Sequence, residues 1–462
     1  VKHDATPECS EIVSRAVKDS YKRLIRPSIV NEMASAAKER SDAAAIAVFA
    51  DNLKSLLMAP PLGRKRVMGV DPGLKSGCKL ACLDAQGGVM ACETIYPLTD
   101  YYHSADIASY LIDRFRIDVI AIGNGTGCRE TVNFFESLNL PRNISIRTVS
   151  EQGASVYSAS DVAREEFPDL DLTLRGAISI GRRLLDPLAE LVKIEPRSIG
   201  VGQYQHSIDP AALAQELDNV VESCVNSVGV DVNTASRQLL ERVSGIGPKL
   251  AGYIIDYRNE NGPFRTRQEL MNVPRMGAKA FQQSAGFLRI HNGDNPLDAT
   301  AIHPEVYPLI ERMAADIGVE TERLVRDSNL YNSIELDKYA TRKLGLPTLT
   351  DIILEFQKPG RDPRTNDSTT RNEPVSNGVN IEDLHIGMEL NGKVVNLTAF
   401  GVFVDIGLHF NGLIHVSQLS DDFVTSPADI VRPGQLVRVK VIDIDVARNR
   451  VALTLRGVPQ NQ

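Results

Sequence analysis

The 462-residue chain lacks tryptophan altogether, and aromatic residues make up only 5% of it. Nowhere do about eighteen apolar residues follow one another without interruption, so we expect no membrane-spanning helix and no membrane partner. No positively charged segment leads into an apolar run near the start, which speaks against a signal peptide. The chain begins at Val1 rather than at a methionine, which suggests a piece of a longer protein. These absences predict a cytoplasmic protein, or a nuclear one if the source is eukaryotic.

Cysteine is scarce and scattered. No two cysteines form a C-x-x-C pair, and none stands beside paired histidines, which argues against a zinc site. We therefore expect reduced thiols, no bound metal and no cofactor. The six cysteines are Cys9, Cys78, Cys82, Cys92, Cys128 and Cys224.

The net charge of −8 does not by itself indicate a nucleic-acid-binding protein. Residues 236–290 differ from the rest, because nine basic residues stand there against four acidic ones, which leaves +5. Such an asymmetry is expected of a module that faces phosphates. The basic residues are Arg237, Arg242, Lys249, Arg258, Arg265, Arg267, Arg275, Lys279 and Arg289, and the acidic ones are Glu241, Asp256, Glu260 and Glu269.

The length predicts three or four domains, and the pattern predicts a multidomain chain with α/β, all-α and all-β parts. Apolar residues at helical spacing predict helices over residues 1–63, part of a larger helical region. Three strand-like runs followed by alternating helices and strands predict an α/β layer with a mixed sheet over 64–193. The remaining boundaries are a hairpin region at 194–299, a helical extension at 300–356, a flexible linker at 357–379 and short antiparallel strands at 380–457.

The α/β segment contains V-D-P-G-x-x-x-G at the end of its first strand, and on this motif it resembles the RuvC/YqgF branch of the ribonuclease-H-like fold. Nucleases of that fold hold two metal ions with three or four carboxylates. The resemblance implies Asp71 as the first of these and Glu151 as a second, while the other positions hold no carboxylate. The alternative for Asp71 is a turn residue that hydrogen-bonds the next backbone groups. The later G-N-G-T-G run could hold phosphate at a helix start.

Two loops in the basic region predict phosphate contacts. In V-S-G-I-G-P-K, Gly245 and Gly247 permit a tight turn and close backbone approach, and Lys249 follows in the first helical turn. Gly277 and Lys279 are placed similarly in N-V-P-R-M-G-A-K. The pair resembles the helix-hairpin-helix module, which grips nucleic-acid backbone without reading sequence. The alternative is a module reused for protein packing.

The last eighty or so residues carry F-G-V-F-V-D and G-L-I-H-V-S-Q-L-S in order. On these motifs they resemble the S-one RNA-binding domain, a five-stranded OB-fold barrel. The resemblance implies a nucleic-acid face at Phe400, Phe403, His415, Asp445 and Arg450, where exposed aromatic rings would stack on bases. The alternative is that Phe400 and His415 pack at the rim of the barrel.

With these segments in this order, nearly the whole chain resembles the Tex family of bacterial transcription accessory proteins. The resemblance implies a factor that binds single-stranded RNA or DNA without catalysis. Duplex DNA is a further expected ligand, and RNA polymerase or the ribosome are further candidate partners. Two alternatives stay open: a metal-dependent nuclease or resolvase that uses Asp71 and Glu151, and a docking platform for such a machine.

Overall fold

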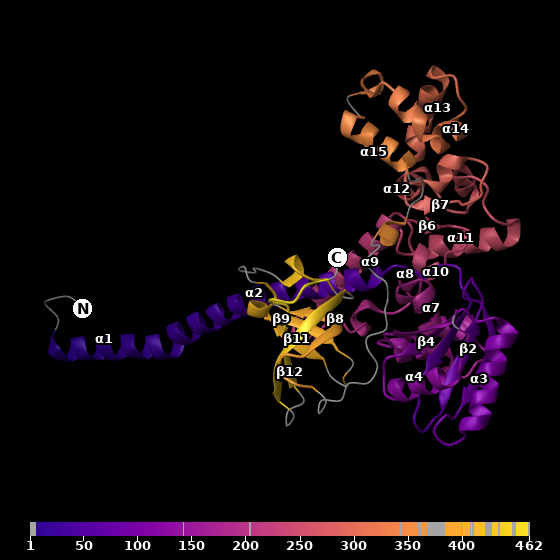
Figure 1. Cartoon of the computed structure of the whole chain (residues 1–462). Coiled ribbons are helices and arrows are strands. Elements are labelled where there is room, and N and C mark those ends of the chain that lie inside the picture. The colour runs from indigo at the N-terminus through magenta and orange to yellow at the C-terminus, as the bar shows by residue number, and fades with distance from the viewer. Residues whose placement is uncertain are drawn as a thin grey trace.

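The computed structural model arranges the chain as an N-terminal helical rod, an α/β domain, a series of small helical units and a C-terminal barrel (Figure 1). Within the part of the chain that it describes, no helix is both long enough and apolar enough to cross a bilayer. The described residues are 6–141, 143–202, 205–341, 344–357, 362–366, 384–398, 400–406, 408, 411–420, 427–432, 435–445 and 450–460.

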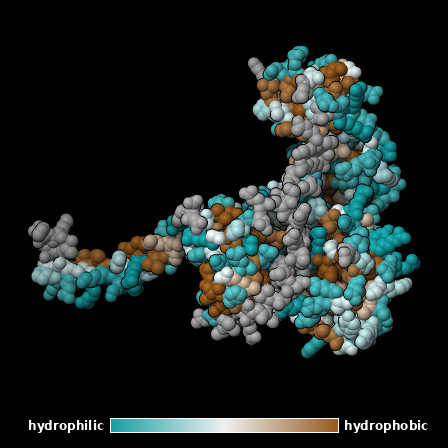
Figure 2. All heavy atoms as spheres, viewed as in Figure 1, coloured by the Kyte–Doolittle hydropathy of each residue, from teal (hydrophilic) through white to brown (hydrophobic). Residues whose placement is uncertain are grey.

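The N-terminal rod is a nearly continuous helix in which a short π-helical turn separates two α-helices, and it projects away from the other elements (Figure 1). Its first half buries no side chain, and apolar patches lie along it (Figure 2). Only the last turns are buried, where Leu53 and Leu57 pack against helix α9. The rod consists of α1 (Pro7–Ser20), η1 (Tyr21–Ile25) and α2 (Arg26–Leu57), and α9 spans Pro210–Val228.

The predicted mixed sheet is confirmed: its strands run in the order β3-β2-β1-β4-β5, with β1, β4 and β5 parallel. Helices α3 and α4 cover one face and α7 covers the other, which is why the central strands are apolar on both faces. Helix α7 can approach β1 closely because residue 69 is a glycine. A Cβ added there would collide with the Ala177 carbonyl oxygen. The elements are β1 (Val67–Asp71), β2 (Cys78–Leu83), β3 (Val89–Ile95), α3 (Tyr101–Phe115), β4 (Val119–Gly123), α4 (Cys128–Ser137), β5 (Ser145–Val149), α5 (Ala154–Ala159), α6 (Asp161–Glu166), α7 (Leu172–Leu185) and α8 (Pro187–Leu191).

Two helical units follow, each with its own core. The first shares a continuous core with the end of the rod and with α8, whereas the second packs around Ile310, Leu324 and Phe356. The first contains α9, β6 (Val230–Asp231), α10 (Arg237–Leu240), α11 (Pro248–Asn261), η4 (Arg267–Asn272), α12 (Ala278–Ser284) and β7 (Leu288–Arg289). The second contains η5 (Pro296–Ala299), α13 (Tyr307–Asp316), α14 (Thr321–Arg326) and α15 (Leu346–Gln357).

The C-terminal strands close into the predicted five-stranded barrel, in the order β10-β12-β11-β8-β9. Its interior is filled by alternate residues such as Val402, Val404 and Ile414, which are fully buried. The strands are β8 (Glu389–Thr398), β9 (Gly401–Asp405), β10 (Gly412–His415), β11 (Leu436–Asp445) and β12 (Arg450–Thr454).

Part of the predicted linker is attached to the α/β domain. The short turn η9 (Pro363–Asn366) carries Arg364, which is 6% exposed. Its guanidinium donates to both carboxylate oxygens of Asp186, at 2.6 and 3.1 Å, and also to Asp362 at 2.7 Å. Because buried arginine forks of this kind are geometrically specific, this part of the predicted linker is held against the α/β domain. Residues 358–361 and 367–379 of that predicted linker lie outside the described residues.

Candidate nucleic-acid interface

The barrel presents two aromatic rings on its outer surface. Phe403 lies between the buried Val402 and Val404 on β9 and therefore points outward, while Phe400 precedes the strand and is 46% exposed. The two rings lie edge to face, with centroids 6.1 Å apart. Two accessible rings at this spacing form a platform on which bases can stack.

The neighbouring strands place polar groups beside this platform. His415 on β10 pairs with Gly401, and its Nδ1 lies 2.9 Å from Ser417 Oγ, so the turn that follows orients the ring. Leu413 pairs with both Phe403 and Ala452, so these three residues share the outer face of the barrel. Arg450 lies two residues before Ala452 on β12 and therefore faces the same way. It pairs with Asp445 on β11. The barrel thus brings the five predicted residues onto, or directly before, adjoining strands. Their contact with a ligand stays a prediction.

Each predicted phosphate loop leads directly into a helix. Gly245 has φ +84°, in the left-handed region that favours glycine, and Gly247 is the N-cap residue of α11, which begins at Pro248. Gly277 is the N-cap residue of the shorter α12. A Cβ added to Gly247 or Gly277 would meet nothing within 4 Å, so the backbone at both helix starts is accessible. Lys249 and Lys279 follow in the first turns and are exposed.

Six of the nine basic residues in this region are engaged by other groups of the protein, so the +5 count overstates the charge that the region offers to phosphates. Three of its arginines are engaged with backbone carbonyls, and three pair with carboxylates. Arg258, Arg267 and Arg289 form the first set, and Arg237, Arg242 and Arg265 form the second. Of the nine basic residues counted above, Lys249, Arg275 and Lys279 show neither an ion pair nor a side-chain hydrogen bond in the described part of the chain, and all three are exposed at the loops.

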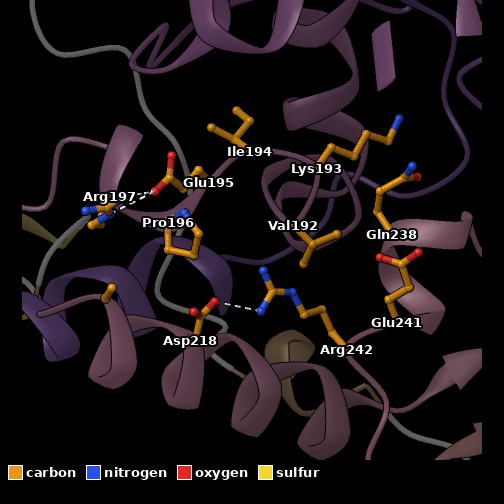
Figure 3. Close-up of a pocket in the computed structure, with 11 residues that line it drawn as sticks. Val192, Lys193, Ile194, Glu195, Pro196, Arg197, Asp218, Gln238, Glu241 and Arg242 are labelled. Carbon is orange, nitrogen blue, oxygen red and sulfur yellow. Dashed lines mark hydrogen bonds and ion pairs between the residues drawn. The ribbon is translucent and has the colours of Figure 1, made fainter. Parts of the chain in front are cut away.

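A pocket of about 300 Å³ lies beside the first loop, between α9, α10 and the segment after α8 (Figure 3). Arg242 donates to Asp218 at 2.7 Å across it, and Arg197 pairs with Glu195. Lys193, on the same wall, pairs with Glu166 and Glu190. Because each of these cations is already neutralised, the pocket has mixed charge and does not favour a phosphate.

The α/β domain brings Asp71 and Glu151 together at one edge of the sheet. Burial and the nearby Glu151 charge raise the pKa of Asp71 to about 6, although Lys79 acts in the opposite direction. The Glu151 carboxylate lies against the G-N-G-T-G turn. It is so close that a Cβ added to Gly125 would collide with its Oε1. The turn that the sequence suggested as a phosphate cradle therefore wraps a carboxylate of the protein itself.

Helix α7 offers no third ligand at this point. Gly176 faces Asp71, and a Cβ added there would lie 2.8 Å from Asp71 Oδ2. Within the described residues, no group of three or more His, Cys, Asp or Glu side chains could hold a metal ion. Two carboxylates against a glycine do not fit a two-metal site, so we derive no hydrolytic step here. Lys79 could not be assigned to this site from the sequence, because only the pairing of β1 with β2 places it beside Asp71.

The raised pKa of Asp71 predicts a pH dependence of stability. The folded domain binds a proton on the Asp71 carboxylate more tightly than the unfolded chain does, because the carboxyl of the unfolded chain has a pKa near 3.8. The stabilisation is therefore complete at lower pH and is lost as pH rises through about 6. We expect Asp71→Asn to raise the thermal midpoint relative to wild type progressively between about pH 4 and about pH 7. Thermal scans across this range check it, with the exposed Asp113→Asn as control; parallel profiles for wild type and Asp71→Asn would contradict it.

Family models match four consecutive parts of the chain. They are the Tex protein YqgF-like domain at residues 65–185, a helix-hairpin-helix motif at 225–289, an HHH domain at 295–364 and the S1 RNA-binding domain at 383–456. The third match falls on the segment that the sequence marked only as a helical extension. Its helical spacing was visible, but its loops carry no G-x-G signal.

Curated relatives match along nearly the whole chain. It is 49% identical to "Protein tex" of Bordetella pertussis over 98% of this chain and 58% of that protein. It is 48% identical to "Transcriptional accessory protein Tex" of Neisseria gonorrhoeae, covering 95% of this chain and 58% of the relative. The human "S1 RNA-binding domain-containing protein 1" is 36% identical, over 98% of this chain and 52% of that protein. The chain thus spans little more than half the length of these relatives.

Proposed function

Because the chain belongs to the Tex family, we propose that it is the nucleic-acid-binding part of a transcription accessory factor and acts without catalysis. In this proposal the barrel stacks the bases of single-stranded RNA or DNA on Phe400 and Phe403. The two hairpin loops hold backbone phosphates through their main-chain N–H groups, Lys249 and Lys279. The α/β domain is the scaffold that joins them.

The observation that carries the proposal is the accessible pair of rings on the barrel, 6.1 Å apart, with His415 and Arg450 on adjoining strands. Stacking on aromatic rings is tolerant of sequence and contributes about 1–3 kcal/mol per base. The hairpins add contacts that depend on charge alone. Two modules on one chain raise each other's effective concentration for the same strand.

A binding titration that compares two chains tests the proposal. The intact chain is compared with one that ends at Asn366, which retains the Arg364 fork to Asp186. We expect the shortened chain to lose at least tenfold in affinity for single-stranded RNA, because it lacks stacking worth about 1–3 kcal/mol per base. Its residual binding should weaken steeply with salt, as phosphate contacts do. Equal single-strand affinities for the two chains would overturn the role of the barrel.

The same titration tests the nuclease alternative, which the proximity of Asp71 and Glu151 keeps open. With magnesium present, the labelled strands should stay intact. Shortening of the label that disappears in Asp71→Asn would establish the enzyme instead. Binding of RNA polymerase or the ribosome that persists after nuclease digestion would favour the docking-platform alternative.

A further inference from the structure

The two hairpin loops repeat one another at an offset of thirty residues. Residues 243–249 read V-S-G-I-G-P-K, and residues 273–279 read V-P-R-M-G-A-K. In both, the fifth residue is the glycine directly before a helix and the seventh is an exposed lysine. The third position differs, because Gly245 stands in one loop and Arg275 in the other.

Both third residues have a left-handed backbone, with φ +84° at Gly245 and φ +66° at Arg275. Glycine adopts this conformation freely, whereas a residue with a Cβ is disfavoured in it. On conformational grounds the second loop should therefore also carry glycine. Its arginine is held in a conformation that opposes stability, and such residues are often retained for function.

The packing around the loops explains why only one of them can carry a side chain. A Cβ on Gly245 would lie 2.8 Å from Cβ of Gln283 on α12, so the first loop has no room. The second loop packs in the same way on α11. Tyr253 stands thirty residues before Gln283 and therefore occupies the equivalent position of that helix. There the Arg275 guanidinium lies over the ring, 5.8 Å from its centroid. Each loop thus rests on the other's helix, but only the second presents a cation.

We propose that Arg275 is a phosphate-binding residue that makes the second hairpin a stronger site for the nucleic-acid backbone than the first; this rests on the proposed function of the hairpins. The planar guanidinium suits bidentate contact with a phosphate. Tyr253 restricts its motion beforehand, which lowers the entropy lost on binding. Lys279 lies four residues along the same loop and helix start, and it is also exposed without an ion pair in the described residues.

The test uses the full chain and a short duplex DNA, which cannot offer unpaired bases to the barrel. We expect Arg275→Gly to lower duplex affinity five- to tenfold and to reduce the slope of log K against log salt by about one. The same variant should unfold at the same temperature as wild type or above it, because glycine relieves the left-handed conformation. Arg275→Asn, which tolerates that conformation, should weaken binding similarly, and Arg275→Lys should retain part of the affinity.

The control is Arg326→Gln, which removes an exposed arginine of α14 paired with Glu322 at 3.0 Å, away from the loops. It should leave affinity and salt slope unchanged. An unchanged affinity and slope in Arg275→Gly would overturn the inference, as would a loss of binding that follows a fall in unfolding temperature. If Lys249→Gln and Lys279→Gln also leave duplex binding intact, the proposed role of the hairpins fails as a whole. If these lysine variants weaken binding and Arg275→Gly does not, only the inference fails.

Discussion

The double substitution Phe400→Ala and Phe403→Ala should lower the affinity for single-stranded RNA about a hundredfold, because each ring stacks on a base with about 1–3 kcal/mol. Both rings point away from the barrel interior, which Val402 and Val404 fill. The substitutions should therefore leave the fold intact. Fluorescence anisotropy with a labelled oligonucleotide measures the affinity, and thermal unfolding checks the barrel.

The matched control for this prediction is Ile442→Ala. Ile442 is also an exposed apolar residue of the barrel, on β11, and it is 38% exposed. Its removal should change single-strand affinity by less than about twofold, since an aliphatic side chain offers no ring on which a base can stack. If the double phenylalanine variant binds as wild type does, the rings pack at the rim and the assigned face is wrong.

The salt dependence separates the two binding modules. Loss of the rings should lower affinity by a similar factor at every salt concentration, because stacking releases few counterions. Loss of a cation at the hairpins should instead reduce the salt slope. This distinction matters in a chain of net charge −8, where only local groups of cations can attract phosphate.

Local patterns in the sequence were sufficient to predict the barrel and the hairpins. Alternating valines around Phe403 fix which side chains face outward, and the glycines of G-I-G fix a tight turn before a helix. Both are consequences of residues close together in the chain. For this reason the structure places the five barrel residues on, or directly before, adjoining strands and leaves the backbone open at both helix starts, while their contact with a ligand stays a prediction.

Roles set by distant contacts could not be predicted in this way. Arg267 looks like a surface cation in the sequence, yet it is 1% exposed and bonds residues more than thirty positions away. Glu151 looks like a metal ligand, and only the fold shows that the Gly125 turn encloses it. Arg275 stands in a loop without any marker, because its left-handed backbone and its place over Tyr253 are properties of the folded pair of hairpins.

Arg267 leads to the largest expected effect on stability, because its guanidinium joins the two helical units. It donates to the carbonyl oxygens of Ile302 and Thr300, at 2.6 and 2.5 Å, and to the Tyr307 hydroxyl at 2.8 Å. That hydroxyl donates in turn to Asp298, whose carboxylate also accepts from the Arg267 main-chain N–H. The network is buried, so its acceptors have no access to replacement water bonds.

We expect Arg267→Met to lower the free energy of unfolding of this region by about 3–5 kcal/mol, because it leaves the buried carbonyl oxygens of Ile302 and Thr300 without their donor and removes the charge near the buried Asp298 carboxylate. Arg265→Met is the matched control, since Arg265 pairs with Asp294 while both side chains are more than half exposed. That pair should contribute less than about 1 kcal/mol. Urea unfolding of both variants measures the difference, and an early transition of α13–α15 in Arg267→Met would show that the two units have separated. Similar unfolding curves for the two variants would mean that the network does not hold the units together.

The salt slope of duplex binding should be unchanged in Arg267→Met at low urea, because this buried cation faces the protein and not a phosphate.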